Sequence, residues 1–156
     1  MKAPQKSLAK TMTGLFARVF AASPAPWLPS DTPYPALVRI EPETMGLVRA
    51  AGVYALWHLG VRPRWLRVGG GDDLAALLAA QRHDPEVEIF NANGGVYCAW
   101  AFLALPQIPA VLASLTAQLQ PVLRSSSCAG AAVAAEPGTQ PFPLPPGSGS
   151  RTPPAG

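Results

Sequence analysis

Acidic residues are missing from a long internal stretch of this chain. Between Glu88 and Glu136 there is no Asp or Glu at all. A hard divalent cation needs oxygen ligands, and these usually include a carboxylate. The absence therefore argues against a metal-dependent hydrolase that takes an acidic ligand from this half of the chain, and we expect no metal site.

Charge of either sign is also scarce, and it is unevenly placed. Charged residues make up 13% of the 156 residues, and the net charge is +3. The first 22 residues carry +4 with no acidic residue, whereas residues 39–124 hold seven Arg and seven Asp or Glu. A nucleic-acid-binding domain normally carries its own cationic face. The neutral middle of the chain therefore argues against a broad face of this kind.

Cysteine is nearly absent, and no long apolar run occurs. Cys98 and Cys128 are the two cysteines, and their spacing fits neither a zinc site nor a disulfide framework. We expect a cytoplasmic protein that needs no cofactor. No stretch approaches the about 20 apolar residues of a membrane span, and Arg18 interrupts the apolar region that a secretory signal would need.

Proline and charge patterns divide the chain into parts. Residues 1–22 have the rhythm of a basic amphipathic helix, which either packs on its own domain or contacts a membrane or partner through Met1–Phe20. Residues 23–38 form a Pro-rich linker, from which aromatic side chains can drape over the domain; these are Trp27 and Tyr34. Residues 39–124 contain the predicted folded domain.

Residues 125–156 are predicted to form a disordered tail. They contain seven Pro and five Gly, and too few large apolar groups to offset the entropy of ordering. Within them, Pro141–Pro146 reads Pro-Phe-Pro-Leu-Pro-Pro, which favours polyproline II and can dock in an aromatic groove. The alternative is a segment without a binding role.

Apolar periodicity predicts a small α+β domain with helices packed on a three-stranded sheet, in the order β-β-α-β-α. Strands are predicted over 52–58, 65–68 and 96–102, and helices over 72–81 and 108–122. A short helix over 43–50 is also predicted, whereas residues 86–93 are predicted to be a loop or a weak edge. Gly69–Gly71 is predicted to be a tight turn rather than a phosphate loop, because the P-loop ending Lys-Ser/Thr is missing.

The motifs at the first two strands carry a family resemblance. Gly52–Tyr54 reads Gly-Val-Tyr and Arg67–Gly69 reads Arg-Val-Gly, and Pro121 follows the last helix. Over about residues 52–124 the chain resembles the GIY-YIG nuclease domain. That resemblance implies a catalytic Arg on the helix after the second strand and a metal-binding Glu on the last helix.

Those catalytic residues are missing. Arg67 replaces the Tyr of the second motif, the helix over 72–81 contains no Arg, and Arg82 comes too late to match. The position expected for the Glu falls near Leu112. The chain therefore resembles a degenerate member of the family, and we expect a non-catalytic binding or interaction module with a protein partner.

Two groups of residues remain as candidate sites. Tyr54, His58 and Arg67 can line one cleft of a divergent nuclease, although a packed tyrosine and a structural histidine are the favoured interpretations of the first two. The hairpin residues Arg62, Arg64 and Arg67, together with Trp65, can form a nucleic-acid surface through phosphate contacts and base stacking. The alternative is a solvated hairpin whose Trp covers the sheet. A partner would bind this hairpin or an exposed edge of the sheet.

Overall fold

The structure is a computed structural model that describes residues 27–29, 33–124, 126–127, 142–149 and 152–154. The predicted basic arm, with its membrane-contacting segment Met1–Phe20, lies outside these residues, as does Cys128. Within the described ranges, no helix combines the length and the apolar character that crossing a membrane requires.

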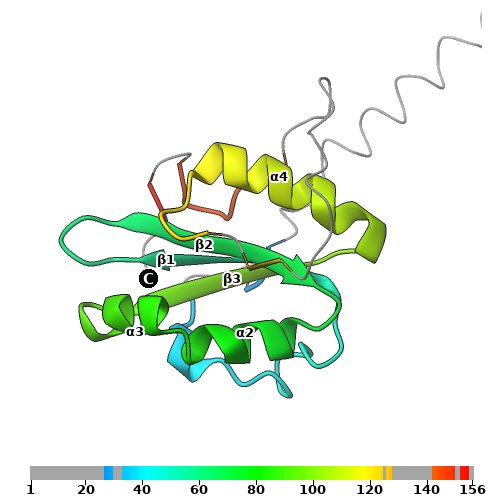
Figure 1. Cartoon of the computed structure of the whole chain (residues 1–156), viewed down its shortest axis with the longest axis horizontal. Coiled ribbons are helices and arrows are strands. Elements are labelled where there is room, and N and C mark those ends of the chain that lie inside the picture. The colour runs from blue at the N-terminus through cyan, green and yellow to red at the C-terminus, as the bar shows by residue number, and fades with distance from the viewer. Residues whose placement is uncertain (1–26, 30–32, 125, 128–141, 150–151, 155–156) are drawn as a thin grey trace, which may run out of the picture.

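Three main strands and three α-helices build the described part of the chain (Figure 1). The strands are β1 (Gly52–His58), β2 (Arg64–Gly71) and β3 (Val96–Phe102), followed by the two-residue β4 (Ser126–Ser127). The helices are α2 (Leu74–Arg82), α3 (Pro85–Ala92) and α4 (Ile108–Leu119), with 3-10 turns η1 (Leu37–Arg39) and η2 (Leu105–Gln107). The predicted α+β class is confirmed, and α3 is an additional helix in the predicted order.

Strand β1 lies between β3 and β2, and it runs antiparallel to both. The short β4 pairs in parallel with the outer side of β2. Every residue of β1 is buried, because helices cover both faces of the sheet. A strand buried on both faces reads as a nearly continuous apolar run, which is what Gly52–Trp57 shows.

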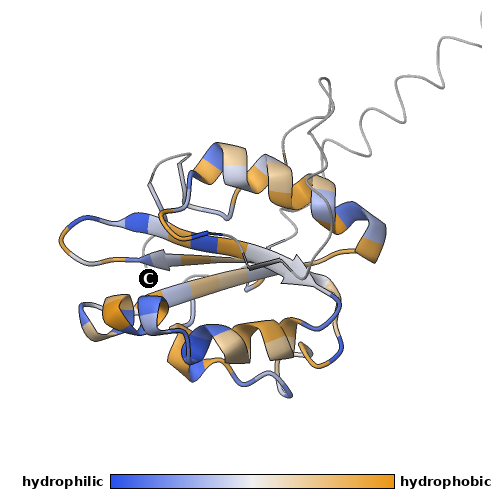
Figure 2. Ribbon diagram, in the orientation of Figure 1, coloured by the Kyte–Doolittle hydropathy of each residue, from blue (hydrophilic) through white to orange (hydrophobic). Residues whose placement is uncertain are grey.

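The helices form two layers on opposite faces of the sheet, with α4 on one face and α2 and α3 on the other (Figure 1). The core under α4 contains Trp27, Tyr34, Val53, Ala55, Trp57, Trp65, Val68, Ile108, Leu115 and Leu119. The core under α2 and α3 contains Leu37, Ile40, Leu47, Tyr54, Leu56, Leu66, Leu74, Leu78, Val87, Val96, Cys98 and Trp100. The predicted alternation of β1 is confirmed, since its odd-numbered and even-numbered apolar residues enter different cores. Both α2 and α4 carry much hydrophobic colour in Figure 2.

Aspartates begin two of the helices. The Asp73 carboxylate accepts hydrogen bonds from the backbone N–H groups of Ala75 and Ala76, at 3.1 and 3.3 Å, and so caps α2. Asp84 accepts from the N–H of Glu86 at 2.9 Å, and Pro85 is the first residue of α3. The prediction of a loop or weak edge over 86–93 is wrong, because an Asp cap followed by Pro begins a helix despite the polar composition.

Two further local predictions are wrong. Residues 43–50 form turns rather than a helix, because Gly46 and Arg49 have left-handed φ angles of 68° and 55° that a continuous helix excludes. Gly69–Gly71 does not turn the chain, since these glycines continue β2 and pair with residues 52–54 of β1.

The outer edge of β3 is covered by the linker that precedes the sheet. Leu28 and Trp100 exchange backbone hydrogen bonds of 2.6 and 3.0 Å, and the Cys98 N–H donates to the Pro35 carbonyl at 3.1 Å. Trp27 is fully buried and Tyr34 is 3% exposed. The prediction that these two aromatic residues drape over the domain is therefore confirmed, and the folded unit begins before residue 39.

The outer edge of β2 is covered by the segment after α4. The N–H groups of Val122 and Leu123 donate to the carbonyls of Trp65 and Leu66, at 3.2 and 2.8 Å, before β4 pairs further along β2. The expectation of an exposed sheet edge for a partner is therefore wrong. An open edge leaves a row of unpaired backbone groups, and this chain pairs both of its edges with its own flanking segments.

Part of the predicted disordered tail lies against the domain. Phe142 and Leu144 pack on the core under α4, and the backbone of the same segment accepts hydrogen bonds from Trp27 and Tyr34. For these residues the prediction of disorder is wrong, because it did not count the aromatic surface that the linker provides. Residues 128–141 of the tail lie outside the described residues.

Candidate functional site

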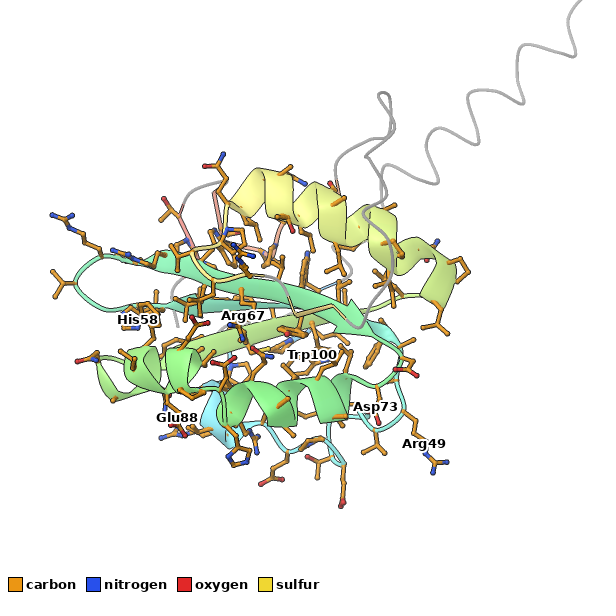
Figure 3. The ribbon with its side chains drawn as sticks, in the orientation of Figure 1. Arg49, His58, Arg67, Asp73, Glu88 and Trp100 are labelled. Carbon is orange, nitrogen blue, oxygen red and sulfur yellow. The ribbon has the colours of Figure 1, made fainter. Side chains whose placement is uncertain are left out.

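A β-bulge decides which face of the sheet Arg67 occupies. Trp57 pairs with Trp65 and Leu56 with Arg67, so Leu66 is an extra residue on β2. A bulge breaks the two-residue alternation of side chains. Arg67 therefore lies on the same face as Leu66, under α2 and α3 (Figure 3).

The Arg67 guanidinium is buried and joins β2 to both helices of this layer. It is 4% exposed, and its Nη1 donates to Gln81 Oε1 at 2.7 Å and to Asp84 Oδ2 at 2.5 Å. Its Nη2 donates to Glu86 Oε2 at 3.0 Å. The hydrogen bond from Arg67 holds the pKa of Asp84 below its ordinary value. Arg67 thus acts as a structural cation at the α2–α3 junction.

Tyr54 enters the same core layer under α2 and α3, and it is fully buried. It pairs across the strands with Gly69, and a Cβ atom at Gly69 would lie 2.4 Å from the tyrosine Oη. The glycine of the second motif therefore makes room for the tyrosine ring of the first. This close approach accounts for both residues by packing.

His58 closes the hairpin end of the same face. It is 7% exposed, its Nδ1 lies 3.0 Å from the Gly95 carbonyl oxygen, and its ring centroid lies 5.4 Å from that of Phe90. A Cβ atom at Gly60 would lie 2.1 Å from His58 Nε2, so the loop backbone covers this second ring nitrogen. Tyr54, His58 and Arg67 are all buried, so these three side chains do not line an open cleft together as predicted.

An open hollow of about 440 Å³ lies between the β1–β2 hairpin and α3. It is lined by His58, Val61, Arg62, Arg64, Phe90 and Asn93. Arg62 and Arg64 are exposed, and the hairpin end carries hydrophilic colour in Figure 2. The hollow therefore combines two accessible cations with apolar side chains from a loop and a helix.

Only part of the predicted nucleic-acid surface is accessible. Trp65 is 2% exposed, and its ring packs edge-on against Trp57 with centroids 5.5 Å apart. Neither Trp65 nor Arg67 can meet a base or a phosphate from this position. Of the four residues of the predicted surface, Arg62 and Arg64 are the two that are exposed. This arrangement matches the alternative interpretation, a solvated hairpin whose Trp covers the sheet.

Two further polar groups near the sheet, Arg82 and Cys98, have structural rather than chemical roles. Arg82 donates from Nε to the Leu37 carbonyl at 3.0 Å and also bonds the Ile40 carbonyl, which ties α2 to η1. Burial raises the pKa of the Cys98 thiol, so this cysteine stays protonated. Among the described residues, no three His, Cys, Asp or Glu side chains are grouped closely enough to hold a metal ion.

Sequence reasoning found the hairpin half of the hollow and missed the helical half. Phe90 and Asn93 line it from α3 and its C-cap, where a loop was predicted. The signal that could have found them is Asp84-Pro85-Glu86, which places a cap, a first-turn proline and a first-turn acid in order.

Comparisons with known protein families, with curated proteins and with solved structures found no match for this chain.

Proposed function

We propose that this protein is a non-catalytic interaction module that binds an anionic partner protein through its hairpin surface, defined as Val61, Arg62, Arg64 and Phe90. The observation that carries the proposal is the hollow itself, which presents accessible arginines beside apolar groups. Val61 is fully exposed at the loop, and the neighbouring Ile89 of α3 is 63% exposed. Protein interfaces are enriched in arginine and apolar anchors of this kind.

A protein partner fits the charge of the domain better than a nucleic acid does. Residues 39–124 hold equal numbers of Arg and acidic residues, and the nearest tryptophan is buried. Two arginines suffice to pair with one or two carboxylates, whereas a nucleic-acid duplex is bound through many phosphate contacts. The partner segment would therefore carry an acidic side chain next to an apolar one.

Nucleic-acid binding is the second candidate, because Arg62 and Arg64 are exposed on the same side of the hollow. The nuclease version of this candidate would use Tyr54, His58 and Arg67, of which only His58 borders the hollow. The degenerate GIY-YIG relationship is likewise a proposal. Its support is the order β1, β2, α2, β3 and α4 together with the Gly-Val-Tyr motif.

The test is fluorescence polarisation of labelled ligands with the purified chain. The ligands are a set of acidic peptides that contain one apolar residue, and single-stranded and double-stranded DNA and RNA, at low and moderate salt. The double variant Arg62→Gln and Arg64→Gln should weaken peptide binding at least ten-fold. The control is Arg49→Gln with Arg124→Gln, which removes the same charge from exposed positions outside the hollow; Arg49 points away from the domain in Figure 3.

The outcomes separate the candidates. Peptide binding that only the hairpin variant weakens supports the proposal. Salt-sensitive binding of DNA or RNA with the same dependence on Arg62 and Arg64 would instead favour the second candidate, and a cleavage assay with Mg²⁺ and Mn²⁺ would follow. Equal effects of the hairpin and control variants would mean that net charge alone drives binding, and the hairpin surface would be rejected.

A further inference from the structure

A second surface lies beside α4 and is covered by a segment of the chain's own tail. The tail segment Phe142–Pro146 lies between the linker aromatics and α4. The Trp27 indole N–H donates to the Pro143 carbonyl at 2.6 Å, and the Tyr34 hydroxyl donates to the Pro146 carbonyl at 3.0 Å. Burial raises the pKa of Tyr34, which keeps this hydroxyl protonated as a donor.

Helix α4 holds the other end of the same segment. Gln118 Nε2 donates to the Phe142 carbonyl at 3.1 Å, and the Phe142 N–H donates to Ser114 Oγ at 3.1 Å. The Phe142 ring packs edge-on against Trp27, with centroids 5.9 Å apart. We call the surface formed by Trp27, Tyr34, Ser114 and Gln118 the aromatic groove.

The contacts of the groove suit a class of peptide rather than one sequence. Its four hydrogen bonds all go to backbone groups of the segment. Apolar contact comes from Phe142 and Leu144, and Pro145 is buried. Aromatic grooves bind proline-rich segments in this manner, with side-chain donors on carbonyl oxygens, because such segments are extended before binding and lose little entropy.

The segment itself is restricted toward that extended shape. Proline fixes its own φ angle, and it also disfavours the helical region for the residue before it. Phe142, Leu144 and Pro145 each precede a proline. The segment then ends in a turn in which the Ser148 N–H donates to the Pro145 carbonyl at 3.2 Å and Gly147 has a φ of 81°. Proline followed by glycine at the two central positions is typical of a type II turn.

We propose that the aromatic groove is a binding site for proline-rich segments of the pattern aromatic-Pro-apolar-Pro-Pro, and that the chain's own tail occupies it until a partner's segment replaces it. This inference concerns a different surface and a different partner from the hairpin proposal. The tail segment belongs to the same chain as the groove, with residues 128–141 between it and β4 in the sequence, and such a covalent connection gives an effective concentration on the order of millimolar. A weak contact is therefore enough to fill the groove in cis, and a partner must bind more tightly or be present at high local concentration.

The test is a titration of the full chain with a blocked peptide of residues 141–148. Binding is monitored through the NMR signal of the Trp27 indole N–H. The same titration is made on a full chain that carries Phe142→Ser and Leu144→Ser, which weaken the tail without touching the groove. The expected result is binding to this double variant at least ten-fold tighter than to the wild type. A peptide with the same two serines should bind neither chain, and Gln118→Ala in the double variant should weaken binding several-fold.

Two results would overturn the proposal. If the double variant is folded and the Trp27 signal does not move at millimolar peptide, the tail is a fixed part of the domain and the proposal is wrong. If the double variant does not fold, the single variant Phe142→Ser is titrated in the same way and judged by the same criterion. Loss of folding in both variants would also overturn the proposal, because a replaceable ligand cannot be essential to the core. None of these results depends on Arg62 or Arg64.

Discussion

Substitutions of the two partners in the buried Arg67–Asp84 ion pair should lower the free energy of unfolding by unequal amounts. Asp84→Asn keeps an oxygen that can cap α3 and accept from Arg67, but it removes the negative charge 2.5 Å from the guanidinium. Removing one partner of a buried ion pair costs about 3 to 5 kcal/mol. Asp84 is 25% exposed, and Glu86 remains as a second counter-charge. We therefore expect the free energy of unfolding to fall by about 2 kcal/mol, which lowers the melting temperature by about 8 to 16 °C.

Replacing Arg67, the other partner of the ion pair, should lower the free energy of unfolding less than Asp84→Asn does. Arg67→Met removes the buried charge and keeps an apolar stem of similar length. It also removes the buried Nε, which has no hydrogen-bond partner in the described part of the chain. Arg67→Met leaves the two carboxylates without their cation, but Asp84 is 25% and Glu86 64% exposed, so water can solvate them, whereas Asp84→Asn leaves a cation buried. We expect a cost of about 1 kcal/mol or less, and Asp84→Asn should then add less than about 0.5 kcal/mol in the Arg67→Met background.

Urea unfolding followed by tryptophan fluorescence would measure all four corners of this cycle. Glu86→Gln is the matched control, because its carboxylate bonds the same guanidinium but is 64% exposed; exposed ion pairs contribute about 0 to 1 kcal/mol. The reasoning is refuted if Arg67→Met destabilises the protein as much as Asp84→Asn does. Additive costs in the double variant would also refute it, because they would mean that the two residues do not interact.

Two further predictions concern packing and pH. Gly69→Ala should lower the free energy of unfolding by about 1 to 3 kcal/mol, because its Cβ atom would lie 2.4 Å from the Tyr54 oxygen, whereas Gly149→Ala meets nothing within 4 Å and should be neutral; urea unfolding compares the two, and equal costs would contradict the packing argument. Arg67 holds the pKa of Asp84 below 3.8 in the folded state, so the stabilisation is present above that pH and is lost as the pH falls below it. Asp84→Asn should therefore flatten the loss of stability as the pH falls below about 4, and an unchanged acid slope in thermal melts would contradict the assignment.

The sequence predicted the sheet well because its signals there are local. Each of the strands over 52–58 and 96–102 has the predicted bounds, since runs of β-branched and aromatic residues bounded by glycine and polar residues are typical of strands. The two faces of β1 also follow directly from a period of two. On β2 that period fails, because the extra residue Leu66 shifts Arg67 by one position. Nothing in the letters Trp-Leu-Arg-Val indicates a bulge.

The candidate site was predicted less well, because its chemistry depends on burial that comes from distant segments. Arg67 is read as a surface cation until α2 and α3 bring Gln81, Asp84 and Glu86 to it. Composition predicts a disordered tail, yet Phe142 of the tail meets Trp27 of the linker on the core. Composition measures each segment alone, whereas here each of two proline-rich segments supplies the apolar surface that the other needs.

The division between structural and accessible groups favours binding over catalysis. Catalysis requires polar groups that reach a substrate, whereas three polar side chains of the α2–α3 layer are used in packing and capping. Tyr54 fills the space beside Gly69, Arg67 joins α2 and α3, and Asp73 caps the N-terminus of α2. The arginines of the hairpin are accessible at the hollow, and the side chains of the aromatic groove bind backbone groups of the tail segment. Under our two proposals, both sets would bind a partner without moving a proton or breaking a bond, and because they lie on different parts of the fold we expect them to be occupied independently.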